Sequence, residues 1–178
     1  AFLDVTTKVG GFDASGEYAQ RVKAAVRERE GLACTIGVAP NKSTAKIASD
    51  LAKPDGLLVI QPEEVAIFLG PLPVTRISGV GMKTAQILEH AGVRTIGQLG
   101  AFPGSELKKL LGKNSVWLWG IAKGIDQMPV EERPDPKSIS VERTFDRDVA
   151  DWSIVQETLD SIVHNVYLRA KGQGASFG

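Results

Sequence analysis

The stretch VTRISGVGMKTAQIL, residues 74–88, contains a glycine-rich turn followed by a basic residue and a hydroxyl, a pattern typical of phosphate binding. Three templates compete for it. A dinucleotide fingerprint requires a third glycine where Thr84 stands, and a longer strand before the turn. A P-loop requires a glycine directly before its lysine, whereas here Met82 separates Gly81 from Lys83. Both nucleotide-binding templates therefore fail at a specific residue.

The third template, a helix-hairpin-helix turn, is filled completely. It needs an apolar residue, a glycine, an apolar residue, a second glycine and a small residue inside the following helix, which here are Ile77, Gly79, Val80, Gly81 and Ala85. The two glycines allow backbone angles that a side chain would forbid, and Val80 can pack between the helices. Free N–H groups at the start of the second helix, together with Lys83 and Thr84, favour a phosphate oxygen. The turn thus indicates binding to a DNA backbone without base readout, with a plain tight turn as the alternative.

The distribution of charge supports this interpretation. Basic and acidic side chains number 21 each in 178 residues, so the formal net charge is zero. Residues 71–130, however, carry a net charge of +4, and the flanking segments are mildly acidic. A basic block around the turn favours a polyanionic partner.

Composition excludes several other classes of protein. A single cysteine, Cys34, excludes an internal disulfide, and with only His90 and His164 the sequence contains no Cys/His zinc cluster. We expect Cys34 to be a small buried side chain and the protein to reside in a reducing cytoplasm. The longest stretch without a charge is 11 residues, too short to span a membrane, so no membrane partner is expected. The chain begins at Ala1 inside an apolar run, which suggests a fragment of a longer protein.

The order of expected elements predicts an α+β, multi-domain chain. Residues 1–61 alternate strand and helix, with strands expected at residues 1–7, 32–39 and 56–60. Residues 62–130 form short helices broken by glycine and proline, with a capping box at Thr95 and Gln98 and with the WLW run, residues 117–119, in the core. Residues 131–137 are a polar, proline-rich linker. Residues 138–178 begin with an expected strand, residues 138–145, and continue with a helix, residues 152–168.

A row of lysines lies on one face of the expected helix that follows Asn41. Lys42, Lys46 and Lys53 share this face, and Thr44, Ile47, Ala48 and Leu51 fall on the opposite, buried side. Asp50, off to one side, is the only nearby carboxylate on the helix that could pair with them. The row is either a solvated basic surface or an anion site for a polyphosphate or a nucleic-acid strand.

Five stretches in this order closely resemble the Y-family translesion DNA polymerases of the DNA polymerase IV type. They are AFLDVT, IGVAPNKSTAKIASDLAKPDGLLVI, PLPVTRISGVGMKTAQIL, GVRTIGQL and KSISVERTFDRDV. The resemblance runs along almost the whole chain. It implies that residues 1–61 are the C-terminal part of the α/β palm and residues 62–130 the all-helical thumb. Residues 131–137 are then a linker, and residues 138–178 the N-terminal part of the α+β little finger.

For function, the resemblance implies an error-prone, template-directed DNA polymerase that acts in translesion synthesis and DNA repair. Its reaction is nucleotidyl transfer with two Mg²⁺ ions, on primer-template DNA and a dNTP. The Asp-Glu pair that holds metal in this family would lie before Ala1, so no catalytic or metal-binding residue is expected in this chain, and the chain alone is expected to be inactive. Asp4 matches the last acidic residue of that signature and is expected to be structural. A sliding clamp would bind a C-terminal segment that is not present in the chain.

The resemblance also assigns binding residues. It implies that Lys53 contacts the triphosphate of the incoming nucleotide and that Lys42 and Lys46 lie near the active-site rim or DNA. The DNA-binding residues expected in the turn are Gly79, Val80, Gly81, Lys83 and Thr84, and those expected at the start of the little finger are Lys137, Ser138 and Ser140. The alternatives are a non-catalytic helix-hairpin-helix module that binds DNA and, weakened by Met82, a P-loop nucleotide hydrolase.

Overall fold

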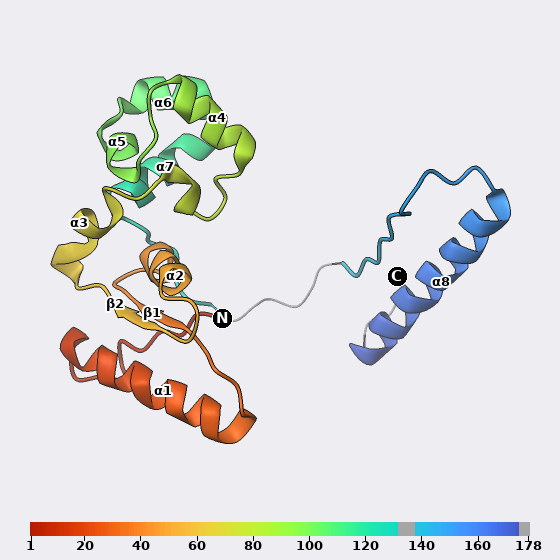
Figure 1. Cartoon of the computed structure of the whole chain (residues 1–178), viewed down its shortest axis with the longest axis horizontal. Helices are drawn as coiled ribbons and strands as arrows, with labels where there is room; N and C mark the ends of the chain where they lie inside the picture. The colour runs from red at the N-terminus through yellow and green to blue at the C-terminus, as the bar shows by residue number, and fades with distance from the viewer. Residues whose placement is uncertain (132–137, 175–178) are drawn as a thin grey trace. The chain divides into compact units, whose positions relative to one another are not determined.

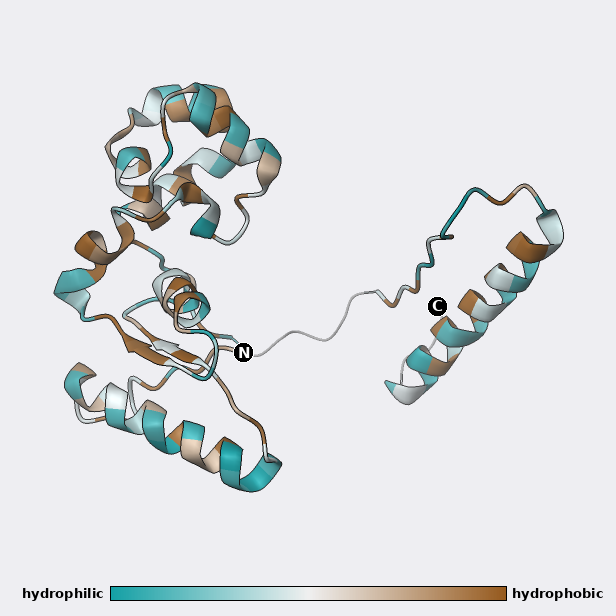
Figure 2. Ribbon diagram, in the orientation of Figure 1, coloured by the Kyte–Doolittle hydropathy of each residue, from teal (hydrophilic) through white to brown (hydrophobic). Residues whose placement is uncertain are grey.

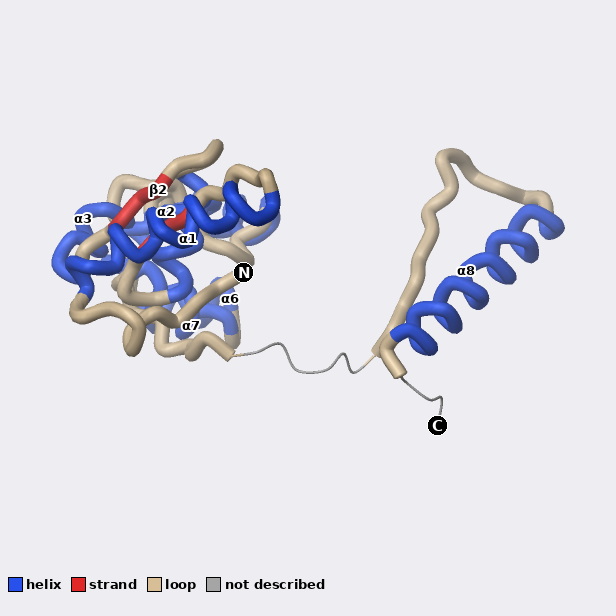
Figure 3. Tube along the Cα trace, turned by 90° about the horizontal axis from the view of Figure 1, so that it is seen from below, coloured by secondary structure: helices blue, strands red, loops and turns tan. Residues whose placement is uncertain are grey.

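The computed structural model describes residues 1–131 and 138–174, and these fall into two compact units (Figure 1). The first unit is Ala1–Glu131, and the second contains the described residues 138–174. Helices dominate both units, and the strands of the first unit are short (Figure 3). The α+β fold class predicted from the sequence is confirmed.

A parallel pair of strands organises the first part of the first unit. β1 (Ile36–Val38) pairs with β2 (Leu57–Val59), and the crossover between them is α2 (Lys42–Leu51). Parallel neighbours cannot be joined by a tight hairpin, so a helical crossover is the expected solution. The strands lie between α2 and α1 (Ser15–Glu30), and both helices pack against them (Figure 1).

Glycine allows α2 to approach β1 closely. A Cβ atom at Gly37 would overlap the backbone of Ala45 and Ser49, so any side chain there would push the helix off the strand. The start of α2 is set by Asn41, whose side chain accepts a hydrogen bond of 2.9 Å from the Thr44 N–H. This is the predicted N-cap. The predicted inner face is also confirmed, since Thr44, Ile47 and Ala48 are buried and Leu51 is partly buried against the core.

The helical block that follows shares its core with the strand layer. Its elements are η2 (Pro62–Glu64), α3 (Val65–Leu69), η3 (Val74–Arg76), α4 (Met82–His90), α5 (Ile96–Ala101), α6 (Gly104–Leu111) and α7 (Asn114–Ala122). One hydrophobic cluster runs from Ile47 of α2 through Leu88 and Leu107 to Ile121 of α7. The predicted capping box at the start of α5 is present, with Thr95 and Gln98 bonding each other's backbone N–H groups.

The second unit contains one long helix, α8 (Trp152–Gly172). Asp151 caps it by accepting a hydrogen bond of 2.9 Å from the Ser153 N–H. Apolar positions recur along α8 between polar ones (Figure 2), and Leu159 and Val163 are exposed. None of the described helices combines the length and the apolarity needed to cross a membrane.

Two predicted strands are wrong. Residues 1–7 and 138–145, all within the described part of the chain, contain no strand. An alternating or apolar run becomes a strand only where a neighbour completes its hydrogen-bonded ladder, and neither segment pairs with one here. The expectation for the WLW run was correct for Leu118, which is buried, and for Trp119, which is partly buried against the core, but wrong for Trp117, which is 40% exposed.

We expect core truncation in α6 to depend strongly on position. Leu107→Ala removes a side chain that is fully buried and should lower the free energy of unfolding by about 2–5 kcal/mol. Leu110→Ala, in the same helix, removes a side chain that is 40% exposed and should cost less than about 1 kcal/mol. Urea unfolding followed by circular dichroism measures both. Equal losses for the two variants would contradict the placement of the core.

Candidate functional site

The glycine turn before α4 is formed by one glycine with unusual backbone angles and one without. Gly79 has φ +94°, in the left-handed region that side chains disfavour. Gly81 has φ −85° and ψ 179°, an extended conformation that any residue adopts. The prediction that both glycines are needed for backbone geometry is therefore correct for Gly79 and wrong for Gly81. Val80, between them, is buried at 7% exposure, as predicted.

Trp117 of α7 packs against this turn. A Cβ atom built on Gly79 would lie 3.2 Å from Cη2 of the Trp117 ring, which is tighter than an ordinary van der Waals contact. The indole thus covers one side of the turn and stays partly open to solvent on its other side. Trp117 thus covers the turn while it remains exposed at 40%.

The start of α4 offers unpaired backbone donors beside open space. Gly81 is the N-cap residue, and among the described residues no side chain caps the helix there. The first N–H groups of a helix have no acceptor within it, and the first bond in α4 is donated by the Ala85 N–H to the Gly81 carbonyl at 2.9 Å. Apart from Gly81 itself and its two chain neighbours, no described residue has an atom within 4 Å of a Cβ built on Gly81. With the exposed Lys83 and half-buried Thr84 nearby, this geometry suits an anion.

The lysines of the α2 region are paired rather than free. The Asp50 carboxylate forms ion pairs with Lys46 Nζ at 2.6 Å and with Lys53 Nζ at 2.8 Å. The hydrogen bond from Lys46 and then that from Lys53 lower the pKa of Asp50. Asp50, the one helix carboxylate that the sequence offered as a partner for the lysine row, therefore pairs with Lys46 and Lys53. Asp50 reaches both because it lies four residues after one and three residues before the other.

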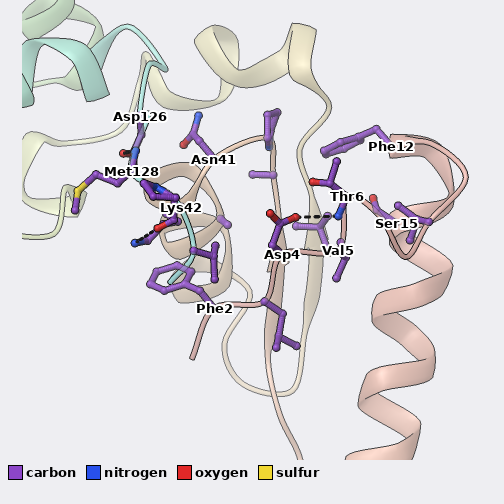
Figure 4. A pocket seen from close by; sticks show the side chains of 18 of the residues that line it. Phe2, Asp4, Val5, Thr6, Phe12, Ser15, Asn41, Lys42, Asp126 and Met128 are labelled. Carbon is purple, nitrogen blue, oxygen red and sulfur yellow. Dashed lines mark hydrogen bonds between the residues drawn. The ribbon is translucent and has the colours of Figure 1, made fainter. Parts of the chain in front are cut away.

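Lys42 contacts different residues from those that Lys46 and Lys53 contact. Its Nζ donates a hydrogen bond of 3.0 Å to the Pro129 carbonyl and lies 5.4 Å from the centre of the Phe2 ring. It lines a cavity of about 490 Å³ together with Asp4, Asn41 and Met128 (Figure 4). Lys46 and Lys53 line a different cavity, of about 420 Å³. The described turn residues line neither cavity, so the structure does not bring the turn and the lysines into one pocket.

Asp4 has a local structural role. Its Oδ1 accepts a hydrogen bond of 2.9 Å from the Thr6 N–H (Figure 4). Hydrogen bonds from Thr6 lower the pKa of Asp4, which is exposed. Within residues 1–131 and 138–174, no group of three His, Cys, Asp or Glu side chains is placed to hold a metal ion. The described residues therefore do not fit a metal centre.

The predicted DNA contacts of the second unit are only partly described. Ser138 and Ser140 are exposed, and the Ser140 carbonyl accepts a hydrogen bond of 3.2 Å from Arg169. Lys137 lies outside the described residues. Their proposed contact with DNA stays a prediction.

A set of polar contacts at the start of α2 has no signature in the sequence. Asp126, which follows α7, accepts hydrogen bonds from the backbone N–H and the hydroxyl of Ser43. These two residues are 83 positions apart, and no local pattern in the sequence signals such a pair.

Family models match three parts of the chain. The impB/mucB/samB family matches residues 1–50, and the C-terminal domain of the same family matches residues 136–178. A model described as DNApol eta/Rev1, HhH motif, matches residues 72–125. The last match contains the glycine turn and confirms the helix-hairpin-helix prediction.

Curated relatives share the sequence over most of this chain. DNA polymerase IV of Methanoculleus marisnigri is 46% identical over 166 residues, which are 93% of this chain and 46% of the relative. DNA polymerase IV of Pseudomonas aeruginosa is 43% identical over 159 residues, which are 89% of this chain and 46% of the relative. The chain thus spans about half the length of the curated relatives it matches.

Solved structures share the fold of this chain. A Y-family DNA polymerase chimera of Dbh and Dpo4 aligns with a TM-score of 0.82 and 35% identity, over 93% of this chain and 48% of the chimera. The insertion ternary complex of Dbh DNA polymerase aligns with a TM-score of 0.70 and 32% identity, over 94% and 49% of the two chains. DinB from Sulfolobus solfataricus aligns with a TM-score of 0.67 and 40% identity, over 72% and 38%.

Substitution by serine should have different effects on stability at the two turn glycines. Gly79→Ser places a side chain at a positive φ and against the Trp117 ring, so it should destabilise the first unit by about 1–2 kcal/mol. Gly81→Ser puts a favoured N-cap residue at an extended position, so stability should stay the same or rise. Thermal unfolding of both variants measures the difference. A stable Gly79→Ser protein beside a destabilised Gly81→Ser protein would refute this description of the turn.

Proposed function

Because this chain belongs to the Y-family of DNA polymerases, of the DNA polymerase IV type, we propose that it forms part of an error-prone, template-directed DNA polymerase. The activity is DNA-directed nucleotidyl transfer in translesion synthesis and DNA repair. The observation that carries the proposal is the helix-hairpin-helix turn at the start of α4, in a chain whose upstream α/β layer bears lysines for a second anion.

We assign the parts of the chain by their structure. Residues 1–61, with the parallel strands, form the C-terminal part of the palm, and residues 62–130, with the helical block, form the thumb. Residues 131–137 link the thumb to residues 138–178, the N-terminal part of the little finger. A sliding clamp would bind a segment outside this chain, and one half-buried cysteine, Cys34, suits a reducing cytoplasm.

The turn would hold the backbone of the primer-template duplex. The α4 N–H groups at Met82 and Lys83 have no acceptor within their helix, and the space beside Gly81 is open. Positive charge from Lys83 and the partial charge of the helix N-terminus both attract a phosphate. Such contacts position the protein on DNA without selecting a base sequence.

Lys53 would contact the triphosphate of the incoming dNTP. Its side chain is 62% exposed and is held beside α2 by Asp50. Because exposed ion pairs contribute little free energy, a triphosphate can replace Asp50 as the partner of Lys53. Lys46, paired with the same carboxylate, would then strengthen the positive potential at the nucleotide. Lys42, already bonded to Pro129, is a weaker candidate for DNA contact.

The metal of the intact enzyme would be Mg²⁺, which activates the primer hydroxyl and stabilises the leaving pyrophosphate. We assign none of its ligands to the described residues, since these include no suitable cluster. The role of this chain in the reaction is therefore to bind and orient the duplex and the triphosphate.

We expect Gly81→Val to weaken DNA binding by about tenfold for all duplex sequences alike, because its side chain fills the space for a phosphate. Fluorescence anisotropy with two duplexes of unrelated sequence measures the dissociation constants. Gly104→Val is the matched control, because Gly104 starts α6 and is also open to solvent. Binding that is unchanged by Gly81→Val, or changed for one duplex only, would contradict the assignment.

The polymerase function is tested in a chimera in which residues 1–178 replace the matching segment of the Methanoculleus marisnigri DNA polymerase IV. Wild-type chimera should extend a primer, and Lys53→Ala should raise the KM for dNTP by about tenfold, through loss of a charge-assisted contact. Lys8→Ala, which changes a lysine outside the proposed site, should leave the KM unchanged. A chimera that binds DNA but extends no primer would favour the non-catalytic DNA-binding module instead.

A further inference from the structure

The first three residues at the start of α2 all bind one segment of the helical block. This segment, residues 124–129, follows α7 and is called the return segment below. The contacts are Asn41 Nδ2 to the Gly124 carbonyl at 2.9 Å, Lys42 Nζ to the Pro129 carbonyl at 3.0 Å, and Ser43 to the Asp126 carboxylate. The donors are consecutive in sequence, and the acceptors lie 83 to 87 residues further along the chain.

Asp126 acts as a second N-cap of α2. Its Oδ2 accepts hydrogen bonds of 3.0 Å from the Ser43 N–H and 2.6 Å from the Ser43 hydroxyl. The Ser43 N–H is one of the helix-start donors that have no acceptor within the helix. Asn41 satisfies the Thr44 N–H locally, and Asp126 satisfies the Ser43 N–H from a distant part of the chain. A carboxylate at this end of a helix is also favoured by the helix dipole.

The carboxylate of Asp126 is held rigidly. Its other oxygen, Oδ1, accepts a hydrogen bond of 3.1 Å from the Met128 N–H, which closes a turn within the return segment. Burial raises the pKa of Asp126, but the hydrogen bonds from Ser43 and Met128 and the charge of Lys42 together lower it. The group is therefore ionised at neutral pH, as a helix cap of this kind requires.

Gly124 allows the return segment to pack closely against α3. Gly124 has φ +76°, and a Cβ atom there would lie 2.6 Å from Cγ1 of Val65 in α3. Its carbonyl is the acceptor for Asn41. Gly124 thus packs closely against α3 and accepts a hydrogen bond from the cap residue of α2. The return segment is therefore held against both helices at this one residue.

We propose that Asp126 is a positioning residue that couples the helical block to the lysines of α2. When the return segment is docked, it caps the N-terminus of α2 and so holds the helix that carries Lys46 and Asp50 and leads to Lys53. The consequence for nucleotide affinity rests on the proposed function, whereas the coupling itself does not.

Hydrogen exchange measured by mass spectrometry on the 178-residue chain tests the coupling without DNA or nucleotide. Asp126→Ala should speed exchange of the α2 amides by about tenfold or more and leave α4 to α7 unchanged. The matched control is Asp151→Ala, because Asp151 accepts from the Ser153 N–H and hydroxyl in the same way, at 2.9 and 2.7 Å. It should speed exchange only at the start of α8.

Two results would overturn the coupling. One is α2 exchange in Asp126→Ala equal to that of the wild type, and the other is an equal acceleration throughout residues 1–131, which indicates general stabilisation only. Asp126→Asn and Ser43→Ala are milder variants that keep part of the hydrogen bonding. Should Asp126→Ala not fold, these variants must show the same local pattern at smaller amplitude, or the proposal fails.

The chimera tests the consequence for nucleotide binding. Asp126→Ala should raise the KM for dNTP about threefold to tenfold while kcat and the dissociation constant for DNA change less than about twofold. A purely structural role would lower kcat and DNA affinity as well, and would refute positioning. An inactive wild-type chimera would refute the proposed polymerase function instead, and the exchange pattern would still decide the coupling.

Discussion

The close approach of α2 to β1 is the constraint on which the rest of the first unit depends. Gly37 is the contact point, because a Cβ there would overlap the backbone of the helix. With the helix seated, β2 can pair in parallel with β1, and the inner face of α2 becomes part of the core that continues into the helical block. Lys46 and Lys53 are then left exposed, whereas Lys42 contacts the Pro129 carbonyl.

Electrostatics on the face that bears Lys46 and Lys53 is governed by one carboxylate. Asp50 pairs with both Lys46 and Lys53, which reduces the positive charge of the face but leaves it net positive. Exposed pairs of this kind are weak, and a polyanion with several charges can compete for both lysines. The lysines on this surface are thus paired with Asp50, but their ion pairs are weak enough for a polyanion to displace the carboxylate. The behaviour of this surface depends on where α2 holds the three side chains.

The two glycines of the helix-hairpin-helix turn have different structural roles. Gly79 is required by backbone geometry and by the Trp117 ring, and Gly81 leaves open space at a helix start. The sequence template alone treats both glycines as equal. In the proposed function the distinction matters, because the position that tolerates a side chain structurally is the one where a side chain would exclude a phosphate. DNA binding and folding would then be separable at this turn.

The sequence by itself determined the features that depend on near neighbours. The Asn41 cap, the Thr95–Gln98 capping box and the glycine turn each rely on residues within a few positions of one another, so their residue types were sufficient to predict them. The tertiary structure alone decided the rest. Residues 1–7 and 138–145 have the composition of strands, yet strands form only where a neighbour supplies the ladder. The bond between Ser43 and Asp126 joins residues 83 positions apart, and only the folded chain brings such groups within hydrogen-bonding distance.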